Sequence, residues 1–230
     1  WQSVLAFDAD KDGREELVLG NIGKNFYLQP DSTNPVKLWI QDFNANGQWE
    51  KILTRSINGK DLPVFTKKEL TDQVPALKKQ NLRHEQYANR SIQELFSKEL
   101  LSKAEQRTFN YCSSVIAWNL GGGNFSVAEL PSQVQWSSVN AILAEDVNGD
   151  GQTDLLLGGN RFALLPQFGR LDASYGHVLL SHGKLGSRTW QYLSGPQAGF
   201  FYRGVTKGIV SIRNKNKSTV LLIPNNDQPK

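Results

Sequence analysis

The chain has 230 residues, of which 39% are hydrophobic and 10% aromatic, so it can bury a sizeable core as one domain or as a domain with an insertion. Its net charge of +4 comes from basic residues that are spread along the chain without a nucleic-acid-binding motif, which argues against a nucleic-acid partner. The single cysteine, Cys112, excludes an intramolecular disulfide and is expected to be a buried apolar residue.

Strand patterns flank an oxygen-rich loop three times along the chain. Residues 4–20 hold an apolar run, an acidic loop and a second apolar run, which predicts a strand, a turn and a strand. The same order returns at residues 38–53 and at residues 141–159. A further strand is predicted at residues 26–28, to complete most of one repeat. We therefore interpret the chain as a repeat protein.

Each of these loops places oxygen-bearing side chains at its first, third, fifth and ninth positions, with a glycine at the sixth. The glycine can take the positive φ that closes the turn, and the seventh residue can offer its carbonyl oxygen. Oxygen ligands without His or Cys suit Ca²⁺ better than zinc or copper. The predicted ligands are Asp8, Asp10, Asp12, Arg14 and Glu16 in loop one, Asp42, Asn44, Asn46, Gln48 and Glu50 in loop two, and Asp146, Asn148, Asp150, Gln152 and Asp154 in loop three.

The twelfth position separates these loops from the helical EF-hand type. An EF-hand needs a bidentate Glu there, whereas this chain has Leu19, Leu53 and Leu157, which cannot ligate a metal. Loop two offers two formal negative charges against four in loop one, so its calcium affinity is expected to be the lowest.

The loops and their flanking strands resemble the FG-GAP or VCBS repeats of β-propellers, whose blades carry a D-x-D-x-D-G-x-x-D calcium loop, as in integrin α-chain propellers. The match is close at residues 143–159, strong at residues 7–20 and degenerate at residues 41–52. Residues 199–204 and 221–227 are also similar to the end of the large ASPIC/UnbV-type VCBS-repeat proteins, common in Bacteroidetes. The resemblance implies a mainly β chain that forms a complete or partial propeller.

The periodicity becomes helical between residues 66 and 106. Thr66 and Glu69 form a capping-box pattern, and apolar residues then recur at helical spacing. We expect a helical insertion that covers a sheet edge or binds a partner. The expected division is therefore propeller blades at residues 1–65, the helical insertion at residues 66–106, and further blades at residues 107–230.

Strand patterns return after the insertion. The glycine-rich run at residues 121–124 lies between two of them and lacks the Lys and Ser/Thr of a phosphate loop, so it is predicted to be a hairpin turn. Outer strands are predicted at residues 175–180 and 187–193, and a closing hairpin at residues 208–223.

No catalytic motif accompanies the three histidines, His84, His177 and His182. We therefore predict a non-catalytic, calcium-binding module that binds a protein or a glycan, as part of a larger surface assembly. Weak oxygen sites of this kind fill at extracellular calcium, with Kd on the order of 10⁻⁴–10⁻³ M, which favours secretion or a place at the cell surface, such as a bacterial outer membrane.

An alternative is that the chain is part of a secreted or surface enzyme of polysaccharide or lipid metabolism, with its catalytic residues elsewhere in the parent chain. The chain begins at Trp1 and contains no methionine, so we expect a processed product or a fragment.

Overall fold

The protein is mainly β, with 40% of residues in strands and 17% in helices. The computed structural model describes residues 1–80, 83–183, 186–214 and 217–225. Contacts divide the chain into two compact units. We call residues 1–29 with 112–230 the large unit, and residues 30–111 the inserted unit. Within the described ranges, no helix is both long enough and apolar enough to cross a membrane.

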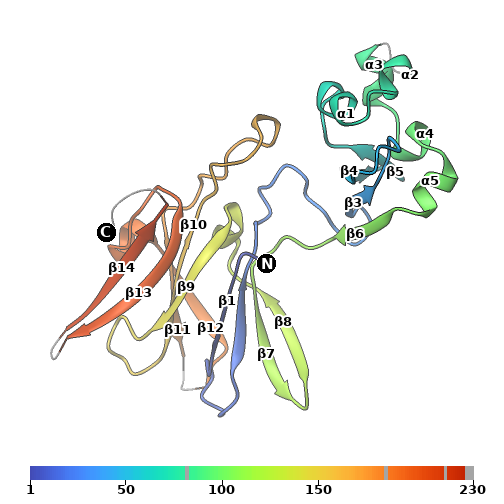
Figure 1. Ribbon diagram of the computed structural model, residues 1–230. Helices are drawn as coiled ribbons and strands as arrows, with labels where there is room; N and C mark the ends of the chain where they lie inside the picture. The colour runs from blue at the N-terminus through green and yellow to red at the C-terminus, as the bar shows by residue number, and fades with distance from the viewer. Residues whose placement is uncertain (81–82, 184–185, 215–216, 226–230) are drawn as a thin grey trace. The chain divides into compact units, whose positions relative to one another are not determined.

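The first sheet of the large unit, sheet A, is antiparallel in the order β1-β2-β7-β8 (Figure 1). Its strands are β1 (Ser3–Phe7), β2 (Glu16–Gly20), β7 (Val115–Gly121) and β8 (Asn124–Glu129). Loop one joins β1 to β2, and the predicted glycine turn joins β7 to β8. The inserted unit leaves the sheet after β2 and the chain returns at β7, so strands distant in sequence pair as neighbours.

The second sheet, sheet C, is a simple antiparallel meander in the order β9-β10-β11-β12. It consists of β9 (Val139–Glu145), β10 (Asp154–Gly159), β11 (His177–His182) and β12 (Thr189–Ser194). Loop three joins β9 to β10, in the place that loop one has in sheet A. The predicted outer strands at residues 175–180 and 187–193 are thereby confirmed within two residues.

The predicted closing hairpin is also present, as β13 (Thr206–Asn214) paired with β14 (Lys217–Pro224). Its turn at residues 215–216 lies outside the described residues. In the described part of the large unit, three short helices connect the strands. They are the 3₁₀ helices η1 (Ser132–Trp136) and η2 (Pro166–Phe168), and α6 (Gly195–Ala198).

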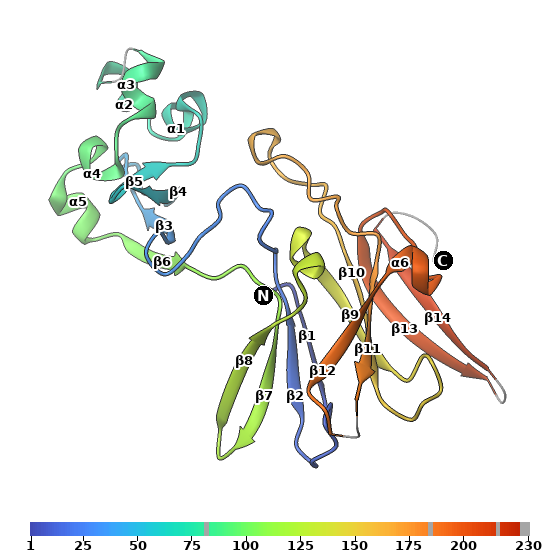
Figure 2. The same cartoon turned by 180° about the vertical axis from the view of Figure 1, so that it is seen from behind.

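The large unit has three layers, which are sheet A, sheet C and the β13–β14 hairpin (Figure 2). Among its described residues, two apolar cores join these layers. One core lies between sheet A and sheet C and includes Val18, Trp118 and Leu157. The other lies between the opposite face of sheet C and the hairpin, and includes Leu156 and Ile209. Both faces of sheet C are therefore buried, which explains why all six residues of β10 are buried.

The inserted unit contains the third sheet, sheet B, in the order β5-β4-β3-β6, and, within residues 30–80 and 83–111, five short helices. Loop two joins β3 to β4. The helices connect β5 to β6, so the helical segment is inserted between two strands of one sheet. The strands are β3 (Val36–Gln41), β4 (Glu50–Ile57), β5 (Lys60–Pro63) and β6 (Glu105–Phe109), and the helices are α1 (Lys67–Gln73), α2 (Leu77–Gln80), α3 (His84–Ala88), α4 (Ile92–Leu95) and α5 (Lys98–Ser102).

The helices cover one face of sheet B. Trp39 and Ile52 of the sheet pack with Leu70 and Ile92 of the helices in a single apolar core. The predicted capping box is confirmed, because Thr66 accepts the N–H of Glu69 and the Glu69 carboxylate accepts the N–H of Thr66. The helices are therefore part of the core of the inserted unit.

Two expectations differ from the structure. Residues 26–28 form a turn closed by a hydrogen bond from the Gln29 N–H to the Phe26 carbonyl, and sheet A takes its outer strands from β7 and β8. The expected boundaries at residues 65 and 106 also differ from the compact units, which divide at 29/30 and 111/112. The reason is that loop two and its strands share one apolar core with the helices, and this core is separate from the cores of the large unit.

Candidate metal centre

The three loops share one pattern of backbone hydrogen bonds. The N–H of the second residue donates to the ninth carboxylate over 2.7, 2.7 and 3.0 Å in loops one, two and three. The fifth and sixth N–H groups donate to the first carboxylate over 2.8–3.2 Å in every loop. The seventh N–H donates to the fifth side chain over 2.8–2.9 Å. The three loops that the sequence predicts as repeats therefore share the same backbone hydrogen bonds.

Positive φ angles at two positions make this turn possible. The sixth-position glycine has φ of 87°, 82° and 82° in loops one, two and three, as its residue type predicted. The fourth position is also left-handed, with φ of 59° at Lys11, 57° at Ala45 and 78° at Gly149. Two non-glycine residues thus hold a conformation that side chains disfavour, because the hydrogen bonds on both sides fix it.

Loop one brings acidic side chains closest together. Among the residues that the structure describes, one group of three potential metal-ligating side chains was found, and it consists of Asp8, Asp10 and Glu16 with their ligand atoms within 4.8 Å of one another. Asp10 and Glu16 are buried, and Asp8 is half-buried. Three carboxylates this close repel one another unless a cation lies between them.

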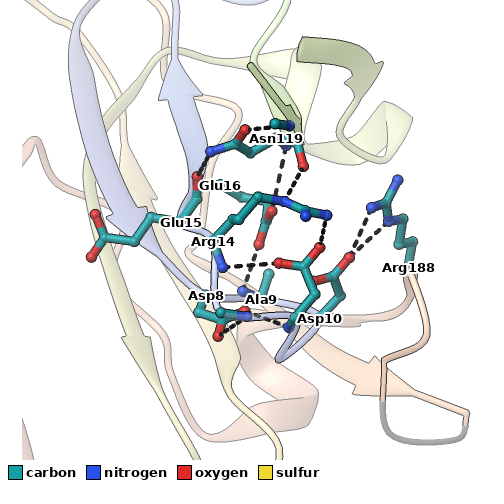
Figure 3. A network of polar contacts seen from close by, with 11 residues as sticks. Asp8, Ala9, Asp10, Arg14, Glu15, Glu16, Asn119 and Arg188 are labelled. Atoms are coloured by element: carbon teal, nitrogen blue, oxygen red, sulfur yellow. Dashed lines mark hydrogen bonds and ion pairs between the residues drawn. The ribbon is translucent and has the colours of Figure 1, made fainter. Parts of the chain in front are cut away.

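Among these three acids, Asp10 gives the clearest indication of a cation site (Figure 3). Its Oδ2 lies 2.9 Å from both Nε and Nη2 of Arg188, which reaches the loop from the connection between β11 and β12. Its Oδ1 is buried and has no hydrogen-bond partner within the described part of the chain. An unpaired buried carboxylate oxygen is costly, and a bound cation would satisfy it.

The side chains of the fifth and seventh residues of loop one, Asp12 and Arg14, pair with each other and connect the loop to sheet A. Asp12 forms an ion pair with the Arg14 guanidinium, and Arg14 Nε donates to the carbonyl of Asn119 on β7 over 3.2 Å (Figure 3). Asn119 in turn donates its side-chain amide to the Glu15 carbonyl over 3.1 Å. The side chain of Arg14 thus ties the loop to sheet A, and only its backbone carbonyl remains as the predicted metal ligand.

Loop two has side-chain amides at its third and fifth positions, Asn44 and Asn46, where loop one has carboxylates. The side-chain amide of Asn44 donates to Glu50 over 3.0 Å and to the Gln73 carbonyl at the end of α1 over 3.0 Å. Asn46 accepts the Gln48 N–H, and Asp42 accepts the N–H groups of the turn. The loop keeps its shape with two formal charges, and its lower calcium affinity stays a prediction.

Loop three has three acids, and the ninth-position Asp154 is fully buried. Burial raises the pKa of Asp154, and the charges of Asp150 and Asp146 raise it further, against the N–H groups of Ser181 and Val147, which lower it. The pKa of Asp150 is instead lowered, first by the Gln152 N–H and then by the Asn148 amide. Without a cation, the charge of Asp154 is therefore held at an energetic cost.

Loops one and three lie side by side in the large unit. Lys11 of loop one donates from Nζ to the Gly151 carbonyl of loop three over 2.5 Å. Gln152 of loop three, in turn, accepts the Ser181 hydroxyl over 3.4 Å. A lysine therefore lies between two acidic loops, where it lowers the repulsion between them.

The sequence pattern did not indicate the residues that reach the loops from outside, namely Arg188, Asn119 and Ser181. Each comes from a strand or turn distant in sequence, and Arg188 lies 178 residues after Asp10. Loop spacing carries no information about such contacts. Strand pairing within sheet A places Asn119 beside loop one, strand pairing within sheet C places Ser181 beside loop three, and the packing of sheet C on sheet A brings Arg188 to loop one.

Comparisons with protein-family models, with curated proteins and with solved structures found no match for this chain. The geometry of the three loops is therefore the basis for a functional assignment.

Proposed function

We propose that this chain is a calcium-binding β-repeat module of the FG-GAP or VCBS type, in which the ions stabilise the fold. The observation that carries the proposal is loop one, where Asp8, Asp10 and Glu16 lie within 4.8 Å and the buried Oδ1 of Asp10 lacks a partner in the described residues. Carboxylate oxygens without His or Cys are the donors that Ca²⁺ prefers.

Loops two and three are proposed as further calcium sites because they repeat the hydrogen-bond pattern of loop one. We expect loops one and three to bind more tightly than loop two, since anionic ligands dominate the attraction for a hard cation. Asp150 and Asp146 lie close enough to raise the pKa of Asp154, so a cation in loop three would relieve this repulsion.

The layered architecture supports a propeller arc as the context of these sites. β1 and β9 are edge strands of sheets A and C, β9 contacts both β1 and β13, and a predicted calcium loop follows the first strand of sheets A and C. We propose that the ions hold these strand pairs together outside the cytoplasm, where calcium is abundant, and that the module presents its surface to a protein or glycan partner.

The experiment is a calcium titration of the intact chain by native mass spectrometry and by thermal unfolding. About three Ca²⁺ are expected to bind, and saturating calcium should raise the free energy of unfolding by roughly 2.7 kcal/mol per site at a hundredfold excess over Kd. No bound calcium, or tight zinc binding with the same stoichiometry, would contradict the proposal.

A matched pair of variants tests loop one in particular. Glu16→Gln removes a buried carboxylate of the acidic group, whereas Glu15→Gln removes the exposed carboxylate of the preceding residue. Only Glu16→Gln should lose one calcium ion. Equal stoichiometry in both variants would show that loop one is not a metal site.

A further inference from the structure

The large unit contains a cavity at a distance from the three loops. Its volume is about 770 Å³, within the range of ligand sites in proteins, which is roughly 300–1,000 Å³. The lining comes from the starts of β1, β9 and β13 and from the segment that follows β10. Loops one and three follow the far ends of β1 and β9, so the cavity and these loops lie at opposite ends of the strands (Figure 1).

A buried asparagine fixes one wall of this cavity. Asn160 is 1% exposed and has a φ of 75°, which residues other than glycine rarely adopt. Its amide nitrogen donates to the Ser174 and Arg203 carbonyls over 2.7 and 3.1 Å. Its Oδ1 accepts the Ser137 hydroxyl and the Ser174 N–H, both over 2.9 Å. Strained backbone that its surroundings hold in place is typical of ligand sites, and here it positions the next residue, Arg161.

Two cationic side chains line the cavity, Arg161 and Lys207, and its described lining includes no carboxylate. The backbone of Arg161 pairs with that of Leu171 over 2.7 and 2.9 Å, and its Nη1 donates to the neutral side chain of Gln2 over 3.2 Å. Within the part of the chain that the structure describes, neither cation forms an ion pair. The positive charge of the cavity therefore favours an anionic ligand.

Uncharged polar groups and aromatic rings complete the lining. The Asn140 amide nitrogen donates to the Asn160 carbonyl over 2.7 Å, while its Oδ1 receives no hydrogen bond from the described residues. The Asn225 side chain likewise forms no hydrogen bond with the described residues. Phe162 and Tyr202 add ring surface. Amides can both donate to and accept from hydroxyl groups, and rings can cover an apolar face, which together suit a sugar.

We propose that this cavity binds an acidic saccharide, with Arg161 and Lys207 on its anionic group and the amides of Asn140 and Asn225 on its hydroxyl groups. Hydrogen bonds between a guanidinium and an anion are stronger than neutral ones, so the anionic group provides most of the affinity. The inference rests on the partner role proposed above and specifies the chemistry of that partner. It does not require a metal in any of the three loops.

The experiment titrates the whole chain with acidic sugars and with their neutral counterparts by calorimetry. The acidic probes are digalacturonate, sialyllactose and galactose 6-sulfate, and the neutral ones are galactobiose, lactose and galactose. At least one acidic probe should bind about tenfold or more tightly than its counterpart, and less tightly at high salt, because salt screens the attraction. If no acidic probe binds more tightly than its counterpart, the proposal is wrong.

Free anions separate a saccharide site from a general anion site. Acetate and inorganic phosphate carry charge without a sugar ring, so they should bind at least about tenfold more weakly than the best acidic probe. Equal affinity for either of them would show that the amides and rings recognise no sugar, and would overturn the proposal.

Three variants locate the binding. Arg161→Gln and Lys207→Gln each remove one cation from the cavity and should weaken binding of the acidic probe by about tenfold or more. Arg213→Gln is the matched control, because Arg213 lies on the same strand as Lys207 but pairs with Glu145 outside the cavity. It should bind as the parent does. Unchanged affinity in both cavity variants would place the ligand elsewhere and overturn the proposal.

Melting curves check that each variant is folded, and the exposed Lys207→Gln maintains the test if Arg161→Gln unfolds. Calcium stoichiometry is measured on the same samples, and the titrations are repeated in EGTA. A chain that binds calcium but no acidic sugar would contradict this inference alone. A chain that binds an acidic sugar in EGTA but has no calcium site would contradict only the proposed role of calcium.

Discussion

Arg188 lies 2.9 Å from Oδ2 of Asp10 with both Nε and Nη2, and its guanidinium carbon lies 4.9 Å from the centre of the Trp118 ring. A side chain from the connection between β11 and β12 thereby supplies a positive charge to the acidic loop of sheet A. In the absence of calcium this arginine offsets part of the repulsion among Asp8, Asp10 and Glu16. The same charge opposes a cation that enters the loop.

Arg188→Gln should therefore have opposite effects on two measurements. In EGTA the melting temperature should fall, because the acidic group loses its counter-charge. In calcium titrations the affinity of loop one should rise several-fold, because the competing positive charge is gone. Arg170→Gln is the control, since Arg170 lies over the Phe162 ring and outside the loops. A lower calcium affinity in Arg188→Gln would show that the arginine orients Asp10 for the metal.

Asp150→Ala tests whether loop three is a structural metal site. The variant removes a charged ligand from the loop, so it should bind one Ca²⁺ fewer and lose about 2.7 kcal/mol of calcium-dependent stability at a hundredfold excess over Kd. In EGTA the melting temperature of the variant should differ from that of the parent by less than it does in calcium. The reason is that Asp150 repels the buried Asp154 and raises its pKa, so removing Asp150 also removes a destabilising interaction.

The control for this variant is Asp172→Ala, which removes an exposed acid of the large unit outside the loops. It should leave calcium stoichiometry unchanged. If Asp150→Ala keeps its full stoichiometry and stability while a measurable turnover disappears, the residue is a catalytic acid and the structural role proposed for loop three is wrong.

His177 makes stability dependent on pH. Burial lowers its pKa from 6.5 to about 4, and it lies between the Ser174 and Tyr192 hydroxyl groups, each 3.1 Å from a ring nitrogen. Between pH 6.5 and about 4, His177 is protonated in the unfolded chain but neutral in the folded chain. The free energy of unfolding should therefore fall as pH decreases through this range. The loss is on the order of 3 kcal/mol.

Chemical denaturation across that pH range measures this effect. His177→Gln should be less stable than the parent at neutral pH but should show a flatter dependence on pH. His182→Gln, at the exposed end of the same strand, should keep the parental slope. An unchanged slope in His177→Gln would mean that other groups control the acid response.

Ile52→Ala should unfold the inserted unit selectively. Ile52 is fully buried between sheet B and the helices, so the cavity should cost about 2–5 kcal/mol. Because the two units have separate cores, the large unit should keep its own denaturation midpoint. Hydrogen exchange resolved by segment measures both. Ile57→Ala, at a partly exposed residue of the same strand, should cost less, and a loss of protection in both units would contradict their independence.

The sequence by itself determined the loops and their strands. The spacing of oxygen ligands around a glycine requires one particular turn, and the apolar runs on both sides require strands, because these are local constraints on φ and on side-chain alternation. The capping box at Thr66 and the glycine turn between β7 and β8 were predictable for the same reason.

Only the tertiary structure decided which strands share a sheet and in which loop the acidic side chains lie close together. Residues 26–28 have strand-like composition, but β7 takes the place beside β2, since an insertion of any length can separate neighbouring strands. Loops one and three have similar spacing, and backbone N–H groups donate to the ninth carboxylate in both. Among the described residues, however, three acids converge only in loop one, where Asp8, Asp10 and Glu16 lie with Arg188 beside them. Arg188 reaches loop one because sheet C packs on sheet A, and spacing along the chain does not encode that packing.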